Sequence, residues 1–317
     1  MCTSDLDAEL IDSRISAELL ELETIQGWKR NPMTYVVIPG AAVDGLIKRT
    51  FAPAFDRLQC VIDRLRQIPS VFLSMKENIE NPPKEFTELA LRMANGALEF
   101  FTETLPTWAA EAAGADRKAE VEFKTANASA VASIADAISW LEQDLLPRSK
   151  GDYAIGREVF QKKLLYEEMV DDSLDRLLYI AKANLENDHA AFIKAAREYM
   201  PSVDPAVAMH MISNDHPSEE SLIPDAQQTV EGIIRFLQDR NIVSIPSEVR
   251  PTIMAPPGFL RAGAFAMMDT PGAYETNARE AFYYVTPPQS DWEAAHKEEH
   301  LRLFNPPVLQ VITIHEA

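Results

Sequence analysis

The sequence has few cysteines and few glycines, and both shortages limit what the protein can be. Of its 317 residues, only Cys2 and Cys60 are cysteines. Two distant cysteines can neither form a disulfide framework nor supply the clustered ligands of a zinc ribbon. The 11 glycines form neither a G-x-G-x-x-G loop nor a Walker A loop, and no G-x-S-x-G elbow is present. The sequence therefore argues against nucleotide chemistry and against a serine hydrolase of the α/β type.

Positive charge is also scarce. Lys and Arg number 30 against 49 Asp and Glu, which gives a formal net charge of -19. Such a surface repels phosphate backbones and anionic membranes, so neither nucleic acid nor membrane is expected as a partner. No run approaches the roughly 18 unbroken apolar residues of a membrane span. Residues 1–30 contain no basic segment followed by an apolar one, so no secretion signal is visible and a cytoplasmic location is expected.

Apolar residues at helical spacing fill most of the chain, which predicts a mainly α fold built as a multi-helix array. Prolines and polar joints divide the array, and residues 31–40 are predicted to form a loop after Asn31-Pro32. The polar stretch 149–152 is a plausible joint. We therefore expect an N-terminal helical region over 1–150, and a helical region with a small sheet over 151–317.

The composition changes near residue 242, where short β-type runs separated by Pro and Gly begin. These runs, at 242–245, 249–254, 263–268 and 281–286, predict a small antiparallel β element within 242–286. Ser290, with Glu293 three residues later, is predicted to cap the next helix. A terminal helix is predicted to begin near Pro307, a position where proline is tolerated.

The C-terminal residues contain a candidate metal-binding motif. A histidine followed directly by a glutamate on a helix is the first half of a zinc-hydrolase signature, and His315-Glu316 ends the predicted terminal helix. The alternative is a packed or capping histidine, because the dipeptide alone is common. His296 and His300 form a rival pair at metal-binding spacing. Lys297, rather than Glu, follows the first of them, so a solvated acidic helix is the alternative there.

Three further residues are candidates for substrate binding. Arg261 lies among apolar residues, where a guanidinium needs a carboxylate from a substrate or from a structural partner such as Asp269 or Glu275. Tyr283 and Tyr284 could place a phenol near a metal centre to stabilise an oxyanion. The alternative for both is an ordinary place in a strand.

Several sequence blocks, taken together and in order, resemble the bacterial domain-of-unknown-function family 885. The resemblance is clear over about 151–317 and diffuse before. The blocks are 156–170 (GREVFQKKLLYEEMV), 246–251 (PSEVRP), 270–274 (TPGAY), 283–288 (YYVTPP), 298–302 (EEHLR) and 314–317 (IHEA).

This resemblance implies a gluzincin-like metallopeptidase related to helical zinc carboxypeptidases, acting on a peptide-like substrate. The family hallmark is His-Glu-Ala, an aromatic residue, then Pro-Gly-His. By this resemblance His315 matches the first zinc ligand and Glu316 the catalytic base, while the Pro-Gly-His part has no counterpart before Ala317. Zinc is the cofactor implied for an intact member of the family, and none is expected to be held by this chain.

Two functions follow as hypotheses. In the first, the chain is the N-terminal portion of a zinc-dependent hydrolase with an incomplete metallopeptidase-like fold, inactive alone. Apolar residues of its terminal helix would then be uncovered and could favour a homo-oligomer; they are Val308, Leu309, Val311 and Ile312. In the second, the chain is a non-catalytic helical scaffold or binding protein.

Overall fold

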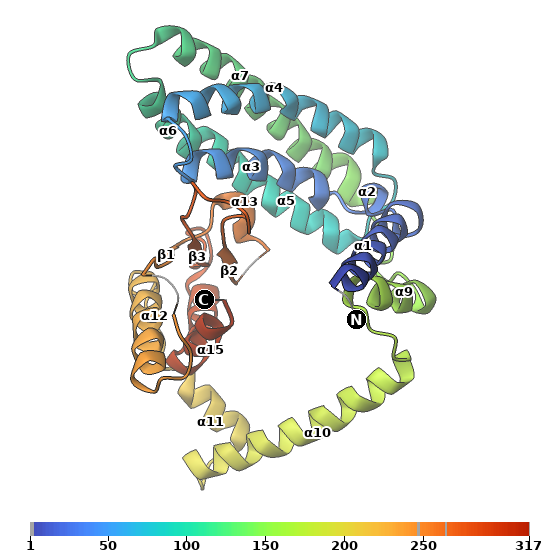
Figure 1. Cartoon of the computed structure of the whole chain (residues 1–317), viewed down its shortest axis with the longest axis vertical. Helices are drawn as coiled ribbons and strands as arrows, with labels where there is room; N and C mark the ends of the chain where they lie inside the picture. The colour runs from blue at the N-terminus through green and yellow to red at the C-terminus, as the bar shows by residue number, and fades with distance from the viewer. Residues whose placement is uncertain (1–2, 246–247, 264, 317) are drawn as a thin grey trace.

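The computed structural model describes residues 3–245, 248–263 and 265–316, so Cys2 and Ala317 lie outside the described residues. A layer of long helices forms one end of the molecule (Figure 1). Its main members are α3 (Met33–Lys48), α4 (Ala54–Asn78), α5 (Lys84–Glu99) and α7 (Arg117–Trp140). Helix α1 (Thr3–Leu19) precedes them, and shorter elements lead into or link them: η1 (Leu20–Ile25), α2 (Gly27–Arg30), η2 (Phe100–Thr104), α6 (Leu105–Ala113), η3 (Leu141–Leu145) and α8 (Leu146–Arg148).

Helix α4 shows why these segments fold together. Its side chains at positions i, i+3, i+4 and i+7 (Leu58, Val61, Ile62 and Leu65) are all buried to 1% exposure or less. This spacing places them on one face, where each buried aliphatic side chain stabilises the fold by about 1.5–3 kcal/mol. Helix α7, which packs on α4, and helix α5, which packs on α3 and α7, present small residues that allow close approach: Ala90, Ala94, Ala97, Ala126, Ala130 and Ala137.

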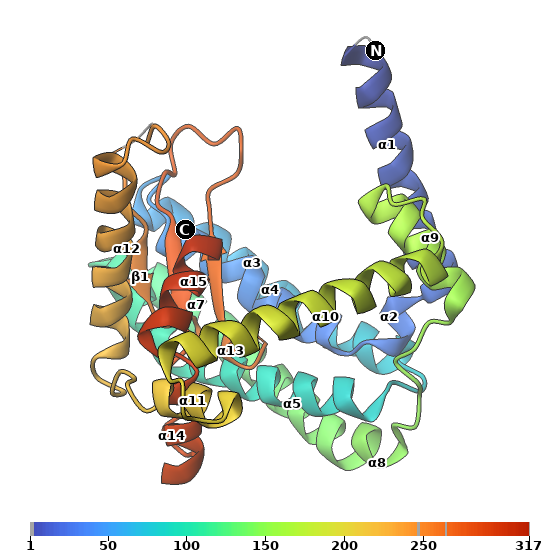
Figure 2. The same ribbon diagram turned by 90° about the horizontal axis from the view of Figure 1, so that it is seen from below.

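Three helices lead away from this layer. They are α9 (Arg157–Glu168), α10 (Leu174–Tyr199) and α11 (Pro205–Ile212). Helix α9 packs on α1, where the Ser13 hydroxyl donates to the Tyr166 carbonyl at 2.6 Å. Helix α10 then runs along the far side of the molecule and joins α9 to α11 (Figures 1 and 2).

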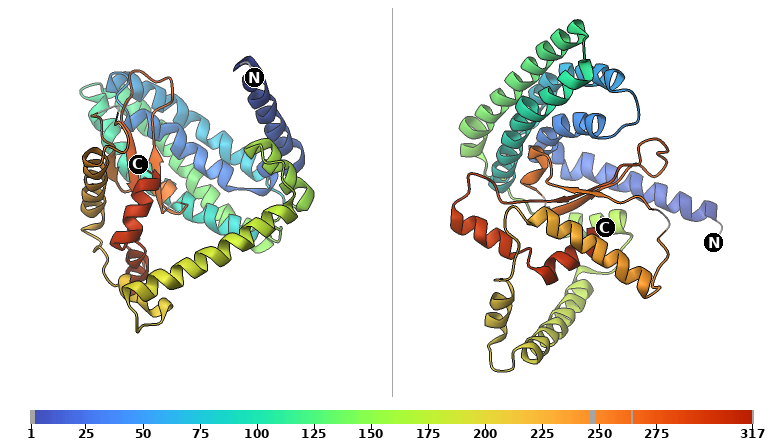
Figure 3. Two further views of the ribbon diagram at one scale, coloured as in Figure 1. Left: turned by 60° about the horizontal axis from the view of Figure 1, so that its bottom comes forward. Right: turned by 90° about the vertical axis from the view of Figure 1, so that its left-hand side faces the viewer.

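A three-stranded sheet lies between the helical layer and the C-terminal helices (Figure 3). The strands β1 (Thr252–Met254), β3 (Phe282–Val285) and β2 (Ala266–Asp269) are adjacent in that order. Strand β3 pairs in parallel with β1 and antiparallel with β2. All four residues of β3 are buried, as expected for a central strand that is covered on both faces.

The face of the sheet opposite the layer is covered by α12 (Leu222–Asp239) and by the last two helices, α14 (Ala294–Arg302) and α15 (Pro306–Glu316). A second hydrophobic core forms here from residues of α12, the sheet and the C-terminal helices. Its buried members are Leu222, Ala226, Val230, Ile253, Tyr283, Val285, Leu301, Phe304 and Leu309.

One short helix joins the two cores. Helix α13 (Gly258–Arg261) places the ring of Phe259, 1% exposed, inside the core of the helical layer. The ring lies edge-on to Phe100 at 5.6 Å and over Gly40. Helix α13 approaches α5 so closely that a Cβ built on Gly96 would lie 2.0 Å from the Gly258 carbonyl oxygen. Gly96 and Gly258 are therefore required by this close contact between the two backbones rather than by their own backbone conformation.

A partly buried ionic cluster is the second junction. Lys48 bridges Asp44 and Asp269, and Arg49 also pairs with Asp269. Burial by itself favours the protonated acid, but hydrogen bonds from Lys48 and Arg49 outweigh it and hold the pKa of Asp269 below its usual value. Burial raises the pKa of Asp44, and its hydrogen bond with Lys48 opposes this only in part. The cluster connects the end of α3 to strand β2.

The mainly α fold with a small β element is confirmed, and the terminal helix begins at Pro306, next to the predicted Pro307. Four details were wrong. The run at 242–245, predicted to be β-type, does not form a strand. The sheet is mixed rather than purely antiparallel. The predicted loop at 31–40 is mostly the first half of α3, which accommodates Pro39 in a buried position. Helix α14 begins after Glu293 rather than after Ser290. The division near residue 150 stays a prediction.

The close crossing of α5 and α13 can be tested with two Gly→Ala variants. Gly96→Ala should lower the free energy of unfolding by about 1–3 kcal/mol, because the new methyl group overlaps the Gly258 backbone. Gly45→Ala is the matched control, since it is also helical but has no atom within 4 Å of the added Cβ. It should raise stability by about 0.5–1 kcal/mol. Equal effects in urea unfolding would contradict the crossing.

The contact between Glu280 and Thr50 predicts a specific acid sensitivity. Hydrogen bonds from the Thr50 hydroxyl and from backbone amides lower the pKa of Glu280 from 4.5 to about 2. A depressed pKa stabilises the fold above about pH 4.5, and this contribution is lost as the pH falls towards 2.

Urea unfolding between pH 6 and pH 2.5 measures this sensitivity. Glu280→Gln should cost most stability near pH 6, and the difference from the natural protein should shrink as the pH falls. Thr50→Val keeps the carboxylate but removes the hydroxyl donor, so it should lose part of the same acid dependence. A Glu280→Gln protein with the natural pH profile would refute the assignment.

Candidate functional site

The His315-Glu316 pair lies in the last turn of α15. Asn305 begins this helix: its side-chain oxygen accepts from the Val308 amide at 3.3 Å, and its carbonyl accepts from the Leu309 amide at 2.9 Å. Leu309 and Thr313 form the buried face of the helix. His315 is exposed and Glu316 is partly buried. The helix is thus fixed along one side, while the imidazole at its end is open to solvent.

A hydrogen-bonded pair of hydroxyls fixes this helix to the sheet. The Tyr283 hydroxyl lies 3.2 Å from Thr313 Oγ1, and Thr313 Oγ1 donates to the Leu309 carbonyl at 2.7 Å. A hydroxyl has a single proton, and a carbonyl can only accept. Because Thr313 uses its proton on Leu309, Tyr283 donates to Thr313.

Glu316 lies within electrostatic reach of this pair. Burial raises the pKa of Tyr283, and the negative charge of Glu316 raises it further. The phenol therefore stays protonated well beyond neutral pH and remains a donor. Since Tyr283 is fully buried, its present role is to hold α15 in place. Its predicted role towards a substrate stays a prediction.

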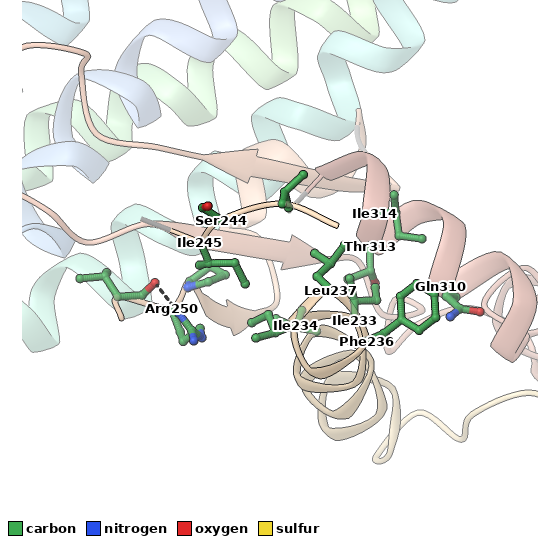
Figure 4. A pocket seen from close by; sticks show the side chains of 14 residues that line it. Ile233, Ile234, Phe236, Leu237, Ser244, Ile245, Arg250, Gln310, Thr313 and Ile314 are labelled. Atoms are coloured by element: carbon green, nitrogen blue, oxygen red, sulfur yellow. Dashed lines mark hydrogen bonds between the residues drawn. The ribbon is translucent and has the colours of Figure 1, made fainter. Parts of the chain in front are cut away.

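An apolar cleft of about 530 Å³ lies beside α15 (Figure 4). Gln310, Thr313 and Ile314 form its wall on α15. The opposite wall comes from the apolar face of α12 and from the segment that leads into β1: Val230, Ile233, Ile234, Phe236, Leu237, Val243, Ser244, Ile245, Val249, Arg250 and Pro251. A concave, mostly apolar site with a few polar groups suits an apolar side chain of a ligand.

The rival histidines are engaged separately. His300 Nε2 lies 2.8 Å from the Thr286 carbonyl oxygen, so this buried nitrogen carries the proton and donates. His296 is exposed and stacks on Trp292 at 3.9 Å. Within residues 3–245, 248–263 and 265–316, no group of three His, Cys, Asp or Glu side chains could hold a metal ion.

The three candidate substrate residues lie in three places. Arg261 borders a more polar cleft of about 630 Å³ that is lined by α5, by α13 and by the segment 287–292. Its carboxylate partner is Glu99 at 3.2 Å rather than Asp269 or Glu275. Tyr283 faces α15. Tyr284 points to the other face of the sheet, where its hydroxyl accepts from Lys48 at 3.3 Å. Successive strand residues alternate between faces, so the two phenols cannot share one site.

The terminal helix is less open than expected. Of the four residues predicted to be uncovered, Leu309 is buried at 3% exposure, while Val308 and Ile312 are partly covered. Val311 is 67% exposed. The prediction is wrong for Leu309 because α12 and the sheet already cover that side of α15.

Sequence reasoning missed the Thr313–Tyr283 contact and the apolar cleft. Thr313 and Tyr283 are 30 positions apart, and a threonine inside an apolar run carries no local signal of its partner. A signal for the cleft was present, since α12 has apolar residues on one face beyond those it buries in the core: Ile233, Phe236 and Leu237.

A chain from Shewanella oneidensis, whose structure is described as "a putative lipoprotein of unknown function", has a similar fold with a TM-score of 0.64 and 25% sequence identity. The match covers 97% of the present chain and 57% of the Shewanella chain, so the present chain spans little more than half of that length. Comparison with curated proteins gives no match. In the part of the chain described by the structure, no helix is both long and apolar enough to cross a membrane.

The profile of one family matches nearly the whole chain, from residue 3 to residue 317. The match extends the resemblance beyond 151–317 to the N-terminal helices. The chain belongs to the family described as "Bacterial protein of unknown function (DUF885)".

Proposed function

We propose that this chain contributes part of the active centre of a zinc-dependent hydrolase that acts on peptide-like substrates. In this proposal Glu316 is the general base and His315 is one zinc ligand. The observation that supports it most is the placement of Glu316: a partly buried carboxylate, on a helix fixed by Tyr283, at the end of the helix that forms one wall of an apolar cleft.

The described residues do not by themselves fit a catalytic zinc ion. Such a site has about three protein ligands and an open position for water. His315 is one exposed imidazole, and the residues that the structure covers hold no suitable group of three. The remaining ligands of the proposed centre would have to come from outside them. We therefore expect this chain alone to be inactive.

The residues of this chain have defined tasks in the proposal. Glu316 would accept a proton from the attacking water, and general bases of this kind accelerate reactions by about 10²–10⁴-fold. The cleft beside Ile314 would hold an apolar side chain of the substrate. Tyr283 would keep α15 at a fixed distance from the sheet through Thr313. Roles for Arg261 and Tyr284 remain predictions, and their positions place them outside this cleft.

A second candidate is a non-catalytic helical scaffold or binding protein. His315 is exposed and, among the residues that the structure describes, belongs to no group of three potential metal ligands, which favours this candidate. A cytoplasmic location also stays a prediction, because the similar Shewanella chain is described as a "putative lipoprotein".

Zinc binding and peptide hydrolysis should be measured on the 317-residue chain and on the product of its complete open reading frame. The chain alone should neither hold stoichiometric zinc nor cleave peptides. In the complete product, Glu316→Gln should lower kcat by about 10²–10⁴-fold with zinc content unchanged. His315→Ala should lose the zinc.

His210→Ala is the matched control, because His210 is an exposed histidine on α11 that lies outside the proposed centre. It should change neither zinc content nor activity. A 317-residue chain that is active with tightly bound zinc would overturn the division of the centre. A complete product without zinc or hydrolysis would leave the scaffold as the function.

A further inference from the structure

Helix α10 presents an apolar stripe that the rest of the described structure does not cover. Leu178, Leu185, Phe192 and Tyr199 recur every seven residues and therefore lie along one line of the helix. Their exposed fractions are 53%, 69%, 39% and 64%. The stripe follows most of the length of this 26-residue helix.

Burial in the present structure does not explain why α10 is a helix. Among its 26 residues only Ala196 is buried, and its main packing partner is the short helix α11. Helices in water are marginal without tertiary packing, which usually supplies most of their stability. Burial of these four large side chains, which lie in one line, would supply stability that the present structure does not provide. The stripe therefore has the character of an interface.

Neighbouring elements have similar faces. Helix α1 exposes large apolar side chains along its length, and α9, which packs on it, exposes Phe160 and Leu165. In α1 these residues are Leu6, Leu10, Ile11, Ile15 and Leu19, each 47% to 61% exposed. In Figure 2, α1 projects from the molecule, α9 lies beside it, and α10 leads away from α9. The uncovered apolar surface is thus shared by α1, α9 and α10.

The charge of α10 indicates which kind of partner could cover the stripe. Helix α10 carries four basic residues (Arg176, Lys182, Lys194, Arg197) and four acidic ones (Asp175, Glu186, Asp188, Glu198), so it is neutral in a chain of net charge -19. A neutral stripe accepts a partner without local repulsion. A second copy would bring another charge of -19 close to the first, which disfavours self-association.

We propose that the α10 stripe, Leu178, Leu185, Phe192 and Tyr199, is the docking surface for helical polypeptide of the same protein outside residues 1–317. The similar Shewanella chain extends beyond the matched part, because the match covers only 57% of it. A seven-residue repeat fits an apposed helix, whose side chains would pack between those of the stripe. This inference rests on apolar surface rather than on metal chemistry, so it stands or falls separately from the proposed hydrolase.

Hydrogen exchange of the α10 amides tests the proposal. The 317-residue chain and the product of the complete open reading frame, extended on both sides of codons 1–317, should be compared. In the longer product, exchange of amides 178–199 should slow by about 100-fold or more, because covered helices open less often. Amides of α4, buried in both proteins, provide the internal reference.

Two variants make the test specific. Leu185→Lys should remove most of the slowing in the longer product. Asn187→Lys places the same charge on the opposite side of α10, at an exposed position, and should leave the slowing unchanged. Sedimentation equilibrium should be measured on both proteins alongside hydrogen exchange, to give their oligomeric states.

Three outcomes would overturn the proposal. The first is a reading frame with no codons beyond 1–317. The second is equal exchange of α10 in the two proteins. The third is a 317-residue chain that dimerises in a way abolished by Leu185→Lys, which would make a second copy the occupant.

Discussion

The insertion of Phe259 into the helical layer is the contact on which the arrangement of the whole structure depends. The ring is supplied by a four-residue helix between two strands, yet it lies inside the core formed by residues 35–145. Gly40 and Gly96 leave the space for this helix, since any side chain there would meet Phe259 or the Gly258 backbone. The strands attached to α13 are thereby held against the layer. The position of α15, which packs on those strands, follows from the same contact.

Strand β3 connects the sheet to a different element on each of its two faces. Tyr283 extends towards α15 and holds the helix that carries Glu316, while Tyr284 extends towards Lys48 in the ionic cluster. The two phenols differ in function because the strand alternates its side chains, not because their local sequence differs. A candidate centre at the end of α15 therefore depends on a strand whose other face is tied to the N-terminal helices.

Elements with strong periodicity could be predicted from the sequence, and contacts between distant residues could not. Helix α4 shows its apolar face directly in the spacing of Leu58, Val61, Ile62 and Leu65. The first half of α3 was missed because prolines suggested a loop, whereas burial of Pro39 offsets its local cost. The pair Lys48 and Asp269 is separated by 221 positions, and no periodicity connects them. The helical position of His315-Glu316 could be predicted; the phenol that holds its helix could not.

The two-sided burial of β3 has a consequence for how the sheet reaches its correct alignment. A slip of one residue would turn Tyr284 towards α15 and Tyr283 towards Lys48. Phe282 and Val285 would also move to the opposite faces of the strand. A phenol hydroxyl can both donate and accept, so either tyrosine could serve Thr313 or Lys48. A slip of one residue, however, would bring Phe282 to the place of Tyr283 or Val285 to the place of Tyr284, and one of the two polar partners would then meet no hydroxyl. Two phenols next to each other would satisfy a hydrophobic pattern in either alignment. Thr313 on one face and Lys48 on the other therefore distinguish the alignments, so this strand of only four residues pairs in a single way.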